Sequence, residues 1–100
     1  MTIRHVVMWK TNGQDAAERA AQAAEVARLL NGLDGVVPEL RAIRAGANML
    51  HPEGNWDVAL VADVDDPEAL AAYQVHPAHV EAAEYIKSVA ASRVAVDFEV

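Results

Sequence analysis

One hundred residues are enough for a single domain with one hydrophobic core, and 53% of them are hydrophobic, which excludes a disordered chain. A formal net charge of −7 argues against a nucleic-acid or anionic-membrane partner, and the absence of cysteine excludes disulfide and thiolate chemistry. No apolar run approaches the roughly 20 residues that cross a bilayer, and residues 1–10 lack a signal-peptide layout. We therefore expect a cytoplasmic protein made of one domain over residues 1–100.

The first half of the chain predicts a strand, a helix and a second strand. Residues 3–10 are rich in β-branched and aromatic side chains, with Ile3, His5, Val7 and Trp9 on one face of a strand. Asp15 fits the N-cap of an alanine-rich helix that runs to Leu30, with Glu18 at the spacing of a capping box. Residues 38–48 predict a weaker strand at the edge of a sheet.

The second half predicts a strand, two consecutive helices and a final strand. Residues 56–64 form a strong apolar strand, and Asp66 with Pro67 fits the N-cap and first position of a helix. A further helix is expected from Pro77 to about Ala91, followed by a strand over residues 92–100. The order β-α-β-β-α-β predicts an α+β, ferredoxin-like sandwich with its helical segments on one face of an antiparallel sheet.

The strands are apolar on both faces, which a two-layer sandwich does not explain. Val6 and Met8 lie opposite Val7 and Trp9, although a sheet covered by helices on one side usually leaves the other side polar. A second copy of the same sheet would cover the open face. We therefore predict a homodimer whose sheets pack face to face.

The segment Tyr73–His79 concentrates the side chains capable of acid–base chemistry. Pro77 should end the first helix near His76, because the residue before proline is disfavoured in the α conformation. His76 then takes the N-cap position of the next helix. The change of direction could bring Tyr73 toward His79, which lies where a helix dipole disfavours the charged imidazolium.

Three interpretations of this segment stay open on the residues alone. Neutral His79 and the Tyr73 hydroxyl suit proton abstraction next to a carbonyl group, with His5 as a third polar group facing the helices. The two histidines could instead only satisfy backbone groups at a helix junction. As a third possibility, His76 and His79 could donate two ligands to a metal, but no clear third ligand lies nearby.

The sequence as a whole resembles the stress-responsive dimeric α/β-barrel (Dabb) family. The resemblance is carried by IRHVVMWK, NWDVALVADVDDPEALAAY, HPAHVE and VAVDFEV, which occur in the family's order over essentially the whole chain. It implies a ferredoxin-like subunit and a homodimer whose sheets form a barrel. The HPxH step after a tyrosine resembles in particular the branch of plant olivetolic acid cyclase, which closes polyketides by aldol condensation without a cofactor.

This resemblance implies that Tyr73 and His79 are the working residues and that His5 matches the histidine of the first strand. In the enzyme hypothesis, His79, Tyr73 and His5 would be catalytic, and Val7, Trp9, Leu60 and Ile86 would line the substrate cavity, with no cofactor and no metal. The chain departs from that cyclase at Val58, where the enzyme has a further histidine, and around Ala82 and Ala90, where it has aromatic side chains.

We therefore expect a cofactor-independent cyclase or lyase of a small carbonyl or polyketide-like compound. The alternatives are a non-enzymatic stress-related homodimer that binds an apolar metabolite, and a cofactor-independent monooxygenase of the wider dimeric barrel superfamily.

Overall fold

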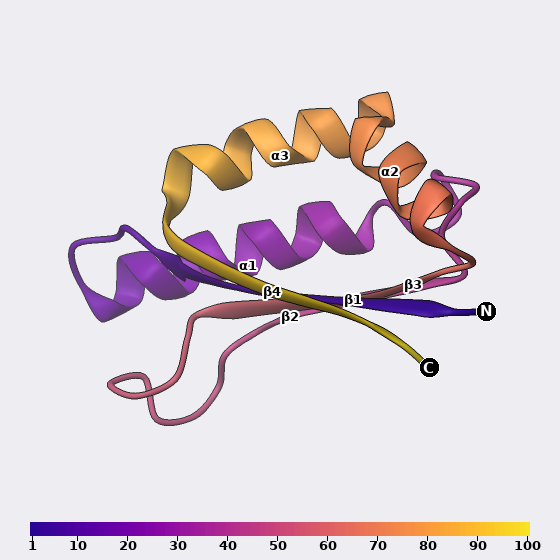
Figure 1. Ribbon diagram of the computed structural model, residues 1–100. Helices are drawn as coiled ribbons and strands as arrows, with labels where there is room; N and C mark the ends of the chain where they lie inside the picture. The colour runs from indigo at the N-terminus through magenta and orange to yellow at the C-terminus, as the bar shows by residue number, and fades with distance from the viewer.

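The computed structural model describes residues 1–100 as a four-stranded antiparallel sheet with three helices on one side of it (Figure 1). The sheet order is β2-β3-β1-β4, which confirms the predicted ferredoxin-like fold. The elements are β1 Ile3–Thr11, α1 Ala16–Asn31, β2 Ala42–Ala47, β3 Val58–Val64, α2 Pro67–Val75, α3 Pro77–Val89 and β4 Ala90–Glu99.

Side chains cap the first two helices as the sequence predicts. The Asp15 carboxylate accepts a hydrogen bond from the Glu18 backbone N–H at 2.8 Å, and the Asp66 carboxylate does the same for Ala69 at 2.8 Å. Each bond satisfies one of the N–H groups that a helix N-terminus leaves without a partner. The two caps set the points at which α1 and α2 begin.

Several boundaries differ from the predicted ones. The weak strand begins at Ala42 rather than Pro38, because residues 33–40 fold into successive turns, with Leu40 donating its N–H to the Val37 carbonyl. The next strand begins at Val58 rather than at residue 56. Helix α3 ends at Val89, and the last strand begins directly at Ala90, where it pairs with Thr11.

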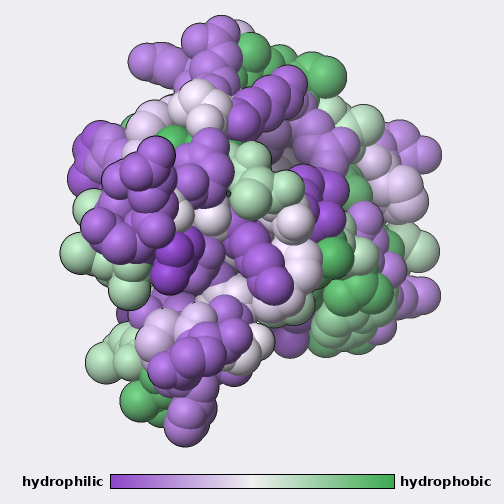
Figure 2. All heavy atoms as spheres, turned by 90° about the vertical axis from the view of Figure 1, so that its left-hand side faces the viewer, coloured by the Kyte–Doolittle hydropathy of each residue, from purple (hydrophilic) through white to green (hydrophobic).

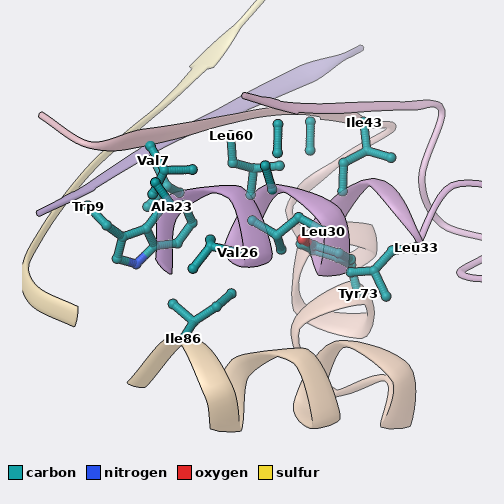
Figure 3. Packing of buried hydrophobic residues seen from close by; sticks show 14 of the residues in the cluster. Val7, Trp9, Ala23, Val26, Leu30, Leu33, Ile43, Leu60, Tyr73 and Ile86 are labelled. Atoms are coloured by element: carbon teal, nitrogen blue, oxygen red, sulfur yellow. The ribbon is translucent and has the colours of Figure 1, made fainter. Parts of the chain in front are cut away.

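The core lies between the sheet and the helices. Figure 3 shows Val7, Trp9 and Leu60 directed from the sheet toward α1 and α3, with Val26 and Leu30 of α1 packed among them. All five are buried. The alternation of β1 sends His5 to this same inner face, because side chains two residues apart in a strand share a face.

The opposite face of the sheet, which we call the outer face, carries no helix (Figure 1). Large hydrophobic side chains are exposed on it from β1, β3 and β4: Met8, Val61, Val94, Val96 and Phe98. The chief polar feature there is the bidentate ion pair between Arg4 and Asp63, at 2.9 and 3.0 Å. Away from the sheet, much of the surface is hydrophilic (Figure 2).

No helix is both long and apolar enough to cross a membrane.

Candidate active site

The junction between α2 and α3 is built on Pro77. Helix α2 ends at Val75, and His76 adopts an extended conformation (φ −60°, ψ 136°), as expected for a residue before proline. The His76 Nδ1 accepts a hydrogen bond from the Ala78 backbone N–H at 3.1 Å. His76 is therefore the N-cap of α3, as predicted, and its ring serves the backbone.

The junction brings three rings from distant parts of the chain together. Tyr73 and His79 meet edge to face, with ring centroids 4.6 Å apart and planes inclined by 64°. The His5 ring also lies edge to face with Tyr73, with centroids 6.4 Å apart. The predicted approach of Tyr73 and His79 is confirmed, and His5 joins them from β1.

The hydrogen bond of His79 assigns its tautomer. Its Nδ1 lies 3.0 Å from the backbone carbonyl oxygen of Gln74. Because a carbonyl oxygen only accepts hydrogen bonds, Nδ1 carries the proton and Nε2 of the neutral ring has a free lone pair. This is the arrangement that a general base requires.

The surroundings of His79 favour its neutral form. Burial lowers the pKa of His79 below its usual value, the hydrogen bond to Gln74 partly opposes this, and electrostatic interactions with nearby basic side chains, among them Arg93 and Lys87, lower it further. Burial thus favours the neutral form of His79, as the position at a helix N-terminus was predicted to do. Near pH 7 the ring can accept a proton.

Tyr73 is more deeply buried than predicted. Its side chain is fully buried, and its hydroxyl is the one buried side-chain polar atom of the chain that makes no hydrogen bond. Burial raises the pKa of Tyr73 to about 12, so the hydroxyl keeps its proton at neutral pH. A buried hydroxyl without a partner costs roughly 1–3 kcal/mol, and such groups in folded proteins call for an explanation.

His5 has a partner that the sequence analysis missed. Its Nδ1 contacts the carboxylate of Asp97, which lies directly opposite in the register of β1 and β4. The contact fixes the orientation of the buried His5 ring. The alternation of the last strand would have placed Asp97 on the inner face, but only the register of the two strands shows that it meets His5.

A cavity of about 230 Å³ lies between the sheet and α3. All four predicted lining residues, Val7, Trp9, Leu60 and Ile86, line it, together with His5 and His79. The lining is completed by residues that were not predicted: Leu30, Gln74, Ala83, Lys87 and Arg93. Tyr73 is not in the lining, so its ring packs behind the histidines.

Three other features bear on the choice of site. A larger hollow of about 340 Å³ lies between the loop after β2 and the sheet, but no titratable side chain lines it. Val58, which stands where the resemblance would place a histidine, is buried in the core. No three His, Cys, Asp or Glu side chains are arranged to hold a metal ion.

Comparison with proteins of known structure gives the same fold. A dimeric ferredoxin-like protein of unknown function from Thermobifida fusca is 36% identical, with a TM-score of 0.84 over 100% of this chain and 92% of that one. A dimeric protein of unknown function from Bacteroides fragilis is 26% identical, with a TM-score of 0.88 over 99% and 96% of the two chains.

A more distant structure has an assigned activity. The hydroxynitrile lyase of Passiflora edulis is 14% identical, with a TM-score of 0.77 over 99% of this chain and 93% of that one, a likeness of fold alone. A search of curated protein sequences finds no match to this chain. The family model of the stress-responsive A/B barrel domain, Dabb, matches residues 3–100, and the chain therefore belongs to that family.

Proposed function

We propose that this protein is a cofactor-independent lyase or cyclase that removes a proton next to a carbonyl group, with His79 as the general base. The observation that carries the proposal is the free Nε2 of a neutral histidine at an apolar cavity. General bases of this kind work best when they are unprotonated near the operating pH. The resemblance to the olivetolic acid cyclase branch supports an aldol-type reaction on a small carbonyl or polyketide-like compound.

The step assigned to His79 conserves atoms and electrons. Nε2 takes the proton from the carbon beside the carbonyl, and the electron pair of that C–H bond forms an enolate with its charge on oxygen. The enolate carbon then attacks a second carbonyl carbon. The oxygen of that second carbonyl recovers the proton from Nε2, so His79 returns to its starting form.

The Tyr73 hydroxyl is assigned to the substrate oxygen, and His5 to orienting the substrate. The Tyr73 hydroxyl keeps its proton and has no partner in the protein, so it is a free donor next to His79, behind the side chains that line the cavity. His5 is held by Asp97 and lines the cavity itself. Donors placed where charge develops typically contribute about 10²–10³-fold to a rate.

A second candidate function is a homodimer that binds an apolar metabolite without chemistry. The position of Tyr73 outside the cavity lining favours it, because a phenol that never meets a ligand would have no catalytic role. The volume of about 230 Å³ suits a one-ring compound, since a cavity of about 150 Å³ binds benzene.

The test of the base is exchange of carbon-bound protons in D₂O, followed by ¹H NMR on a panel of one-ring and short-chain ketones. For at least one ketone, we expect His79→Gln to slow enzyme-dependent exchange by about 10²–10⁴-fold, because the base is lost. His76→Asn is the matched control: it replaces a histidine three residues away with a better N-cap and should exchange at the wild-type rate. Full exchange by His79→Gln, with unchanged thermal unfolding, would contradict the assignment.

Tyr73→Phe separates a catalytic hydroxyl from a structural one. Removing an unsatisfied buried hydroxyl should leave the free energy of unfolding unchanged or raise it, by at most about 1–3 kcal/mol. The same variant should lower the exchange rate about 10²–10³-fold if the hydroxyl binds the substrate oxygen. Urea unfolding and proton exchange measure the two effects. An unchanged exchange rate would remove Tyr73 from the mechanism and leave His79 as the group that carries it.

We also propose that the protein forms a homodimer through the outer face of its sheet. The exposed hydrophobic side chains Val94, Val96 and Phe98 of β4 lie on that face, and solved relatives are dimeric. A contiguous exposed apolar patch of this kind marks an interaction surface.

Val96→Asp should convert the dimer to a monomer, because it places a charge inside the interface. The matched control is Val36→Asp, an equally exposed valine in the turn after α1, which should stay dimeric. Light scattering coupled to size-exclusion chromatography reads the mass directly. A dimer of unchanged affinity in Val96→Asp would show that the subunits meet elsewhere.

A further inference from the structure

Two positively charged side chains stand at the solvent end of the cavity that holds His79. Lys87 lies in the last turn of α3 and Arg93 lies on β4, opposite Trp9 in the strand register. Both line the cavity and both are exposed, whereas its inner walls are buried apolar side chains such as Val7 and Leu60. No acidic side chain lines the cavity.

Neither cation has a partner within the protein. Three arginines elsewhere form ion pairs with carboxylates: Arg4 with Asp63, Arg28 with Glu25 and Arg41 with Asp65. Lys87 and Arg93 form none, in a chain whose carboxylates outnumber its cations by 15 to 8. The remaining unpaired arginine on a strand, Arg44, belongs to β2 at the other edge of the sheet.

Folding alone does not account for this pair. A lysine in the last turn of a helix interacts favourably with the helix dipole, which gives Lys87 a structural role. Arg93 sits on a strand and has no such role. Two cations from different elements that converge on one apolar cavity are the arrangement expected for an anionic group at the end of an apolar ligand.

We propose that the cavity takes a one-ring or short-chain carbonyl compound that carries a carboxylate, which pairs with Arg93 and Lys87. The apolar body would lie against Val7, Leu60 and Ile86, with its carbonyl group toward His79. This proposal rests on the proposed function for the role of His79, and it adds the class of substrate. A planar guanidinium suits it, because Arg binds a carboxylate through two parallel hydrogen bonds.

The test compares two probes of nearly the same shape, the anionic 3-benzoylpropanoate and its neutral amide, by titration calorimetry with the full-length protein at low salt. We expect the acid to bind about tenfold more tightly than the amide, with an advantage that shrinks as salt is added. Arg93→Gln and Lys87→Gln should each weaken binding of the acid about three- to tenfold and leave the amide unchanged. Arg28→Gln, which removes the same charge on the exposed face of α1, is the control and should change neither affinity.

Equal binding of acid and amide, or an equal loss in Arg28→Gln and Arg93→Gln, would overturn the proposal. Tighter binding of phenyl phosphate than of the acid would overturn the choice of a carboxylate. The outcome is independent of catalysis, because His79→Gln should still prefer the acid. If the protein prefers the acid but catalyses no proton exchange, the proposed function fails while this inference holds. If it catalyses proton exchange in the acid and in the amide equally well, this inference fails while the proposed function holds.

Discussion

The helix break at Pro77 is the constraint on which the candidate site depends. In a continuous helix, residues 73 and 79 would lie about 120° apart around the axis and about 9 Å apart along it, so their rings could not meet. Proline instead ends α2 and forces His76 into an extended conformation, so that α3 begins in a new direction. Only then do the rings of Tyr73 and His79 come within 4.6 Å of each other.

The second constraint is the alternation of side chains along β1, which contributes residues to both faces of the sheet. One set of side chains, with His5 and Val7, faces the helices and forms the wall of the cavity on the side of the sheet. The other set, with Val6 and Met8, faces outward and joins the apolar outer face. A shift of one residue in the strand register would exchange the two sets. The cavity and the outer face are therefore fixed by the same register.

Much of the fold and part of the site could be predicted from the sequence. Alternation in strands, capping residues and the histidine–proline step are local signals, and they located the helix junction, the inner face of β1 and four lining residues. The sequence did not predict that Asp97, Lys87 and Arg93 lie at the candidate site. Charged residues on a strand or helix usually face solvent, and only long-range pairing shows what they approach. The depth of Tyr73 also depends on packing between α2, α3 and the sheet. The short second strand was overestimated because Pro38 belongs to turns that the sequence does not distinguish from an extended segment.

The proposed function depends most directly on an unprotonated Nε2 of His79 at the cavity at neutral pH. Long-range ¹H–¹⁵N NMR of the histidine rings measures this directly, because protonated and unprotonated ring nitrogens have well separated shifts. We expect His79 at pH 7 to be neutral with its proton on Nδ1, and its titration midpoint to lie below the usual value of 6.5. A proton on Nε2 at pH 7, or a midpoint above 6.5, would contradict it.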